Sequence, residues 1–239
     1  MKNSPASQEG SPALICAMFD RIAPTYDLLN RLISFGLDRS WRNRAIAAFP
    51  SLPGGKFLDI AAGSGDVTLA LLEKNPGLVV GTDFSLNMLR LSGQKLRSAP
   101  RNSRAGLAAS DALSLPFRDG SFDGTIVAFG IRNFADRPLA LREMFRVLKT
   151  GGTSVILELT VPGNPLAAGL YKFHAKLILP LLGRIISGDR SAYSYLPGSI
   201  DAFPPPGQFL GLMKDAGFVD TAFTTLSFGT ATIFRGGKP

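Results

Sequence analysis

The residues best placed to do chemistry are the acids around one glycine-rich turn. The turn spans residues 61–65 (AAGSG), with Asp59 before it, Asp66 directly after it and Asp83 further along. Glycines let a backbone approach a ligand closely because they carry no side chain. An acid at the end of the next predicted strand, such as Asp83, can accept hydrogen bonds from ribose hydroxyls. The pattern predicts a Rossmann-like nucleotide site.

The turn departs from the dinucleotide fingerprint G-x-G-x-x-G, because Thr68 occupies the place of the third glycine. Asp66 lies where a pyrophosphate would meet the N-terminus of the next helix, and two negative groups there would repel each other. A ligand with an adenosine and a positive charge but no phosphate, S-adenosylmethionine, fits Asp59 and Asp66 better than NAD. A turn that only connects a strand to a helix is the remaining alternative.

Alternating elements are needed to bring these residues to one edge of a sheet. Apolar runs predict strands at 57–60, 78–82, 106–110, 123–129 and 153–160. Helices are predicted at 66–74, 85–98 and 138–148. Ser85 is the expected N-cap of the second helix, and Gly151 with Gly152 is the expected C-terminal cap of the third. This alternation indicates a parallel sheet covered by helices on both faces.

The flanking segments differ from this pattern. A disordered lead is predicted for residues 1–12 and a helical cap for 13–50, with Asp38 as the cap of one of its helices. An insertion is predicted at 161–206, helical at first and loop-like over 191–209, before a last helix near Gln208–Ala216. Two final strands, 218–226 and 228–234, predict an antiparallel hairpin. We expect a single α/β domain, residues 13–239, with a seven-stranded and mostly parallel sheet.

Composition bounds the classes of protein that need to be considered. The 239 residues are 45% hydrophobic and 18% charged, with a net charge of +8, which suits an anionic partner. The single cysteine, Cys16, excludes an internal disulfide and fits a reducing cytoplasm. No secretory signal is visible, no metal-ligand spacing occurs, and no motif supports nucleic acid. The apolar stretch Leu166–Ile186 is interrupted by charged residues, proline and glycine, so it does not predict a bilayer span.

Several stretches of the sequence resemble a known family. "LDIAAGSGDVT", "GTDFSLNML", "DALSLPFRDGSFD" and "LREMFRVLKTGG" resemble successive motifs of class I S-adenosylmethionine-dependent methyltransferases. "MFDRIAPTYDLLNRLISFGLDRSWR" and "FGIRNFADRPLALREMFRVLKTGG" resemble, more narrowly, the demethylmenaquinone/2-methoxy-benzoquinol C-methyltransferases of menaquinone and ubiquinone biosynthesis. The similarity covers roughly residues 18–235. It implies a Rossmann-like class I methyltransferase that methylates a ring carbon of a demethylated isoprenoid quinol. The resemblance does not distinguish a naphthoquinol substrate from a benzoquinol substrate.

The resemblance also implies cofactor contacts for S-adenosylmethionine. They fall on Tyr26, Asp59, Ala61, Gly63, Ser64, Gly65, Asp83, Phe84, Met88, Asp111 and Ala112. Tyr26 would close over the methionine end, Asp83 would hold the ribose, and Asp111 would accept from the adenine amino group. Relatives often have Asn in place of Asp111 and Ser in place of Ala128, and the loop 204–206 is richer in proline than theirs.

Arg132 in "FGIRN" is the first catalytic candidate, because its guanidinium stays charged and would stabilise a quinolate at the end of the fourth strand. The alternative is that Arg132 anchors a loop. Asp66 is the second candidate, as a proton relay, and its alternative is an acid favoured by the helix dipole. Substrate contacts are predicted for Asn133, His174 and Tyr195. The alternative for Asn133 is that it only positions the same loop as Arg132. The alternative for His174 is a position on a helix surface, and for Tyr195 it is a role as a packed loop anchor.

The segment Leu166–Ile186 has apolar residues on one helical face and carries Lys172, Lys176 and Arg184. Under the quinol interpretation it rests on an anionic membrane or lines a groove for the isoprenoid tail. A lid or a homodimer face is the alternative. We expect a cytoplasmic enzyme, peripheral on the inner face of the cytoplasmic membrane. Rival functions are methylation of another small molecule, a lipid or RNA, and a non-catalytic S-adenosylmethionine-binding partner protein.

Overall fold

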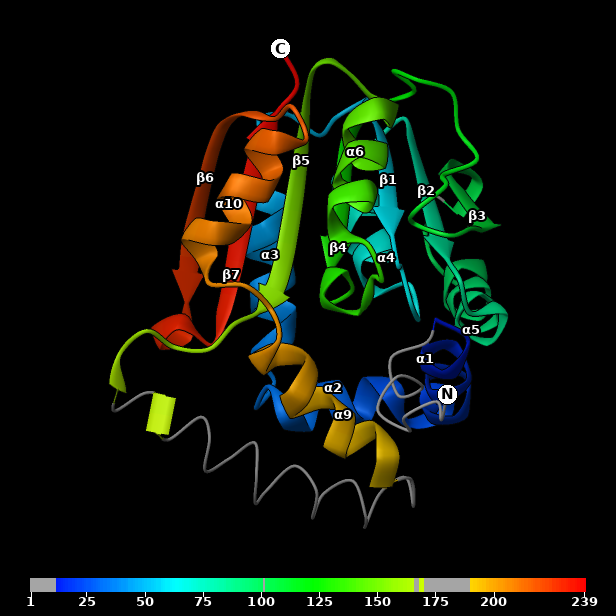
Figure 1. Cartoon of the computed structure of the whole chain (residues 1–239). Helices are drawn as coiled ribbons and strands as arrows, with labels where there is room; N and C mark the ends of the chain where they lie inside the picture. The colour runs from blue at the N-terminus through cyan, green and yellow to red at the C-terminus, as the bar shows by residue number, and fades with distance from the viewer. Residues whose placement is uncertain (1–11, 101, 166–167, 170–189) are drawn as a thin grey trace, which may run out of the picture.

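Seven strands form one sheet, in the order β3-β2-β1-β4-β5-β7-β6. The structure is a computed structural model that describes residues 12–100, 102–165, 168–169 and 190–239 (Figure 1). The strands are β1 (Lys56–Ile60), β2 (Leu78–Asp83), β3 (Ala105–Ala109), β4 (Phe122–Ala128), β5 (Leu148–Leu159), β6 (Val219–Leu226) and β7 (Ala231–Gly237). Strands β1 to β5 are parallel to one another, and β7 runs antiparallel between β5 and β6. The predicted sheet and its C-terminal hairpin are therefore confirmed.

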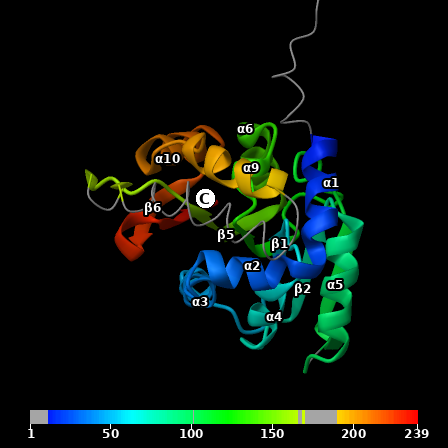
Figure 2. The same ribbon diagram turned by 90° about the horizontal axis from the view of Figure 1, so that it is seen from below.

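Helices cover both faces of the sheet because the buried strands are apolar on both sides (Figure 2). In β1, Phe57 packs into one core, whereas Leu58 and Ile60 pack into the other. The first core is covered by α3 (Asp38–Ala47), α4 (Asp66–Leu72) and α5 (Leu86–Arg97). The second is covered by α6 (Arg137–Val147) and α10 (Pro206–Asp215).

Three further helices lie across one end of the sheet. They are α1 (Pro12–Ile22), α2 (Tyr26–Ile33) and α9 (Arg190–Asp201), and the 3-10 turn η2 (Ala23–Thr25) joins the first two. Figure 1 shows all three beneath the sheet, beyond the carboxyl ends of the parallel strands. Open α/β sheets place their ligand sites at this end. The N-terminal segment and the region after β5 thus meet over one edge.

Two sequence predictions about element ends are wrong. The pair Gly151 and Gly152 does not cap α6, because that helix ends at Val147 and the chain turns directly into β5. Instead these glycines exchange backbone hydrogen bonds with Lys238, and Gly151 takes the left-handed conformation (φ +76°). Asp38 is not an N-cap either, because Leu37 occupies that position. Asp38 lies in the first turn of α3, where it is buried. Ser85, by contrast, caps α5 as predicted, since its hydroxyl accepts from the amide of Met88 at 3.1 Å.

The loop predicted at 191–209 is largely helical. Helix α9 runs to Asp201 although Pro197 lies inside it. A proline weakens a helix by removing one donor, but Ser199 and Ile200 are buried here, so tertiary packing outweighs the local signal. The proline-rich loop 204–206 starts α10, with Pro205 as its N-cap and Pro206 as its first residue.

Some predictions lie outside the described residues. These are most of the disordered lead and the amphipathic segment with Lys172, His174, Lys176 and Arg184. Within the part of the chain that the structure describes, no helix is long and apolar enough to cross a membrane.

Candidate active site

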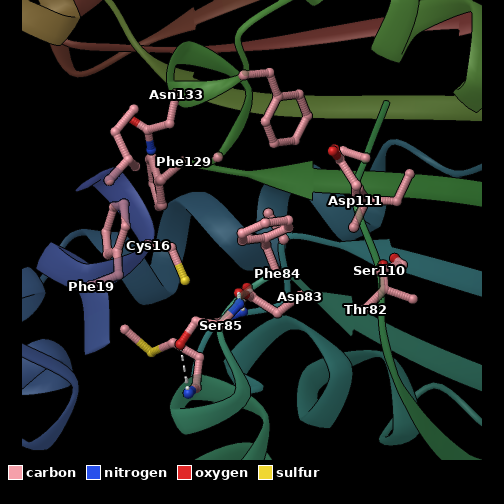
Figure 3. Close-up of a pocket in the computed structure, with 18 of the residues that line it drawn as sticks. Cys16, Phe19, Thr82, Asp83, Phe84, Ser85, Ser110, Asp111, Phe129 and Asn133 are labelled. Atoms are coloured by element: carbon pink, nitrogen blue, oxygen red, sulfur yellow. Dashed lines mark hydrogen bonds between the residues drawn. The ribbon is translucent and has the colours of Figure 1, made fainter. Parts of the chain in front are cut away.

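A pocket lies where the carboxyl ends of β1, β2 and β4 and the segment after β3 face helix α1. Its apolar walls include Ile15, Phe19, Phe84, Met88, Leu113 and Phe134. Its polar groups come from Tyr26, Asp83, Ser85, Ser110, Asp111 and Asn133. In Figure 3, Cys16 and Phe19 of α1 lie on one side, Ser110 and Asp111 lie on the other, and Phe84 projects between them. Apolar surface with a few polar groups is the usual composition of a small-molecule site.

Asp83 forms the junction between β2 and the glycine turn. One carboxylate oxygen accepts from the amide of Gly63 and the other from the amide of Ser85, both at 2.8 Å. Burial, and to a smaller extent the nearby Asp20 carboxylate, raises the pKa of Asp83 above its ordinary value, although the backbone amides counteract this. Each oxygen keeps a lone pair. Asp83 can therefore hold the turn in place and also accept hydrogen bonds from a ligand.

Two residues without glycine's freedom are held in the left-handed region at the pocket wall. Ala61 after β1 has φ +55° and Phe129 after β4 has φ +60°. Such conformations cost energy and persist only where the surroundings impose them, commonly at functional sites. Gly130 is needed beside them, because a Cβ there would lie 2.8 Å from the Cβ of Ala61. The backbone at the ends of β1 and β4 is therefore shaped for close approach.

The "YD" pair of α2 joins the N-terminal helices to the glycine turn. Tyr26 lines the pocket beside Gly63. The hydroxyl of Ser64 donates to Asp27 at 2.5 Å, and Lys95 of α5 pairs with the same carboxylate at 2.5 Å. Burial alone would raise the pKa of Asp27, but the hydrogen bonds from Lys95 and Ser64 outweigh it and hold the pKa below its ordinary value. Tyr26 is thus fixed over the turn.

Asp66 belongs to the same group of charges. It pairs with Lys95 at 2.7 Å and with Arg42 of α3 at 3.4 Å, and Arg42 also bonds to Asp38. Asp66 is not among the residues that line the pocket. The geometry favours the interpretation of Asp66 as a first-turn acid of α4 that binds neighbouring helices, rather than as a proton relay.

Asp59 lies in the core beneath the turn rather than in the pocket. Its side chain is 1% exposed and accepts from the hydroxyl of Thr68 at 2.7 Å. Burial raises the pKa of Asp59 to about 7, and the Thr68 hydrogen bond only partly offsets this. Ser64 and Gly65 also lie behind the pocket surface. The other predicted cofactor residues line it: Tyr26, Ala61, Gly63, Asp83, Phe84, Met88, Asp111 and Ala112.

We expect Asp59 to make stability depend on pH. Because the folded pKa of about 7 exceeds the ordinary 3.8, the folded state binds a proton that the unfolded state releases. The stabilising contribution is complete below about pH 4 and is lost as pH rises through 7, with a slope of up to about 1.4 kcal/mol per pH unit. In Asp59→Asn this slope should disappear from urea denaturation curves measured between pH 5 and 8.

Asp123→Asn is the matched control for that experiment. Burial acts to raise the pKa of Asp123, but hydrogen bonds from Lys149 and the amide of Lys56 outweigh it and lower the pKa. Its stabilising contribution is therefore present above the unfolded pKa and lost in acid. Asp123→Asn should leave the slope between pH 5 and 8 unchanged. Equal slopes for wild type and Asp59→Asn would contradict the assignment.

Arg132 lies behind the pocket wall. Its guanidinium pairs with Glu158 at 2.8 Å, donates to the carbonyl of Phe129, and lies 3.3 Å from the hydroxyl of Ser199 on α9. The Arg132 amide also donates to Glu158, which is fully buried. Arg132 itself is 8% exposed and does not line the pocket. This geometry favours the anchoring interpretation over direct contact with a substrate.

The structure brings together Asn133 and Tyr195, two of the residues predicted to contact a substrate. Asn133 lines the pocket, and its amide oxygen accepts from the Tyr195 hydroxyl at 3.1 Å. Burial raises the pKa of the Tyr195 phenol, and the positive charges of Arg132 and Arg137 offset part of the rise. The third predicted contact, His174, lies outside the described residues.

Sequence reasoning missed several residues of the site. Cys16, Phe19, Ser110 and Phe134 line the pocket, and Asp27 with Lys95 holds Tyr26 in place. For Asp27 the signal was available, since it adjoins Tyr26 in the "YDLLN" block. Phe19 lies in the stretch that resembles the quinone methyltransferases, but its place in the pocket, like that of Cys16, could not be read from the sequence, because α1 is brought to the sheet only by folding.

The charges of the pocket distinguish between ligand classes. Among its described lining residues, two are acids, Asp83 and Asp111, and none is Lys, Arg or His. A phosphate-bearing dinucleotide would meet no cation there and would be repelled by both carboxylates. The hydroxyl of Ser110 is buried in the pocket wall and has no hydrogen-bond partner among the residues that the structure describes. The site therefore suits a neutral or cationic ligand that carries hydrogen-bonding groups.

Solved structures share the fold. A methyltransferase from Thermotoga maritima, described as S-adenosylmethionine-dependent, superposes with a TM-score of 0.67 at 18% identity, covering 93% of this chain and 99% of its own. The [4+2]-cyclase SpnF superposes with a TM-score of 0.72, also at 18% identity, covering 95% and 96% of the two chains. At these identities the likeness shows the class I methyltransferase fold and nothing about the reaction.

Curated proteins are more similar in sequence. The chain is 46% identical over 220 residues to the ubiquinone/menaquinone biosynthesis C-methyltransferase UbiE of Syntrophotalea carbinolica, covering 92% of each chain. It is 44% identical to the demethylmenaquinone methyltransferase of Thermus thermophilus, covering 93% of this chain and all of the relative. The model of the ubiE/COQ5 methyltransferase family matches residues 7–238. The chain belongs to the ubiE/COQ5 methyltransferase family.

Proposed function

We propose that this chain transfers a methyl group from S-adenosylmethionine to a ring carbon of a demethylated isoprenoid quinol in respiratory quinone biosynthesis. The observation that carries the proposal is the pocket itself, which joins two carboxylates to apolar and aromatic walls and contains no described cation. The relatives named as ubiquinone/menaquinone and demethylmenaquinone methyltransferases support the choice of substrate.

The pocket residues fit the cofactor. Asp83 would bind the ribose hydroxyls with its free lone pairs, and Phe84 and Leu113 would flank the adenine ring. Asp111 already accepts from the amide of Leu113 at 2.9 Å, which holds its carboxylate in the pocket wall. Tyr26 would cover the methionine end next to Gly63. When bound, S-adenosylmethionine supplies an electrophilic methyl carbon on a sulfonium.

The substrate must become nucleophilic at carbon. A quinol carbon ortho to a hydroxyl gains electron density when that hydroxyl loses its proton, so the protein has to stabilise the oxyanion. The Asn133 amide oxygen is occupied by Tyr195, which leaves the amide nitrogen as a donor toward the pocket. We assign Asn133 to the quinolate oxygen and Tyr195 to orienting Asn133. Alignment of the two reactants would contribute roughly 7–11 kcal/mol to lowering the barrier.

A labelling experiment tests the proposal. The protein is incubated with methyl-labelled S-adenosylmethionine and, in separate reactions, with reduced demethylmenaquinone, with a reduced demethylated 2-methoxy-benzoquinone, or with total RNA. We expect label in at least one quinol and none in RNA. The reverse result would replace the proposal by the RNA alternative.

The variant Asp83→Ala tests the assignment of the cofactor site. Loss of a carboxylate that holds both the turn and the ribose should weaken S-adenosylmethionine binding about 100-fold, which corresponds to about 2.7 kcal/mol. Isothermal titration calorimetry measures this independently of turnover. Unchanged affinity in Asp83→Ala would show that the cofactor binds elsewhere.

A further inference from the structure

Helix α2 has one side that faces the pocket and another side that faces solvent. Tyr26 points into the pocket, whereas positions 28, 31 and 32 follow the three- and four-residue spacing of a single face of α2. Leu28 on this face is 51% exposed and Leu32 is 38% exposed, and Phe35 in the turn that follows the helix is 75% exposed. Arg31 lies between them and is exposed. Apolar residues repeated on an outward helical face are not explained by the core of this domain.

The exposed apolar surface continues beyond α2. Leu37 in the α2–α3 connection is 42% exposed, and Arg39 follows it. The 3-10 turn η6 (Ser227–Gly229), between β6 and β7, presents Phe228, which is 92% exposed. The indole of Trp41 donates to Ser227 at 3.0 Å and so holds η6 beside the start of α3. We call this surface the α2–η6 face: Leu28, Arg31, Leu32, Phe35, Leu37, Arg39 and Phe228.

The exposed charges of the described N-terminal helices near this face are positive. Between Pro12 and Phe49 every acidic side chain is turned to a partner inside the protein. Asp20 accepts from Ser85, Asp27 pairs with Lys95, and Asp38 pairs with Arg42. Arg31 and Arg39 are exposed and form no ion pair with another described residue. Apolar side chains interspersed with unneutralised cations match the phosphates and acyl boundary of an anionic bilayer.

The position of the face relative to the pocket is favourable. Helix α2 lies below the sheet in Figure 1 and is in front in Figure 2, which looks onto that end of the molecule. The pocket is at the same end, with Tyr26 of the same helix in its wall. An isoprenoid quinol has its tail in a bilayer, so an enzyme for it must bring this end of the sheet to the lipid surface.

We propose that the α2–η6 face docks on the surface of an anionic phospholipid bilayer. The proposal rests on the proposed function for its purpose, but its geometry is independent of the reaction. Leu28, Leu32 and Phe228 enter the acyl boundary, while Arg31 and Arg39 bind lipid phosphates. A symmetric pairing of two such faces would bring the arginines of two copies together, which disfavours a homodimer through this surface.

Vesicle sedimentation tests the proposal with the full chain. Wild type should bind vesicles of phosphatidylglycerol and phosphatidylcholine in equal parts, and bind pure phosphatidylcholine at least about tenfold more weakly, because each exposed arginine contributes near the surface. Leu32→Ser/Phe228→Ser and Arg31→Glu/Arg39→Glu should each weaken binding to the anionic vesicles about tenfold or more. Raising the salt concentration should abolish the difference between wild type and the charge variant.

Matched controls lie at the opposite end of the sheet. Val219, at the start of β6, is 42% exposed, and Arg118 is exposed just before β4. Val219→Ser and Arg118→Glu are compared with the single face variants Leu32→Ser and Arg31→Glu, which make the same type of change on the face. Vesicle binding by the two controls should stay within twofold of wild type. Circular dichroism and thermal melting of all variants exclude misfolding as the cause. Equal loss in the controls and the face variants would overturn the proposal.

Turnover separates this proposal from the proposed function. With a short-chain quinol dissolved in buffer, the face variants should methylate as wild type does, whereas with long-chain quinol in anionic vesicles they should be at least about tenfold slower. Absence of methylation in every arm together with retained vesicle binding would refute the function and leave the face intact. Sedimentation equilibrium showing a dimer that the same substitutions dissociate, with no vesicle binding, would replace the lipid by a second copy of the chain.

Discussion

Arg132→Ala is expected to lower the free energy of unfolding by about 3–5 kcal/mol, because it leaves the fully buried Glu158 without its guanidinium partner. It also removes the donors to the carbonyl of Phe129 and to Ser199, so the loop that carries Asn133 would lose its attachment to β5 and α9. Chemical denaturation monitored by circular dichroism measures the effect. Lys149→Ala, which breaks the exposed Lys149–Asp123 pair, should cost no more than about 1 kcal/mol.

The double variant Arg132→Met/Glu158→Gln separates anchoring from chemistry. Replacing both charges removes the uncompensated carboxylate and should restore most of the lost stability. If Arg132 is a positioning residue, the turnover number should recover in parallel with stability. If instead the fold recovers while turnover stays at least about 100-fold below wild type at saturating substrates, the guanidinium takes part in stabilising the quinolate.

Gly65→Ala is expected to destabilise the fold by about 3 kcal/mol or more and to abolish cofactor binding. Gly65 has φ +86°, which disfavours any residue with a Cβ. A Cβ at this position would also overlap the hydroxyl of Ser92, and it would approach the Cβ and Cα of Ser92 to 3.0 and 3.2 Å. Since Ser92 belongs to α5, the turn cannot move aside without displacing that helix.

Gly36→Ala provides the comparison for this overlap. Gly36 has a similar φ of +75°, but a Cβ there would meet nothing within 4 Å. It should therefore cost only the conformational penalty of about 1–2 kcal/mol. The difference between the two variants, measured by urea denaturation, isolates the steric contribution of Ser92. Equal effects would mean that the turn and α5 can separate freely.

Local patterns in the sequence were sufficient for the sheet and for the centre of the site. Strands β1 to β4 lie within one residue of their predicted bounds, because short apolar runs between glycine and proline breaks are a strong local signal. Gly63 with its left-handed φ, and Asp83 at the end of β2, were likewise found from spacing alone. Local rules alone gave wrong predictions for the glycines after α6, which do not cap that helix, and for the proline inside α9, which does not interrupt it. In both places tertiary packing outweighs the local preference.

The sequence by itself determined the alternating strands, the glycine turn and its acid, because each depends on neighbours in the chain. Tertiary structure alone decided the environment of every charge. Asp27 meets Ser64 across 37 residues, and Arg132 meets Ser199 across 67. The burial that raises the pKa of Asp59 to about 7 is set by which helix covers β1. Charge pairing and desolvation act over distances in space, so these properties appear only when the sheet order brings distant segments together.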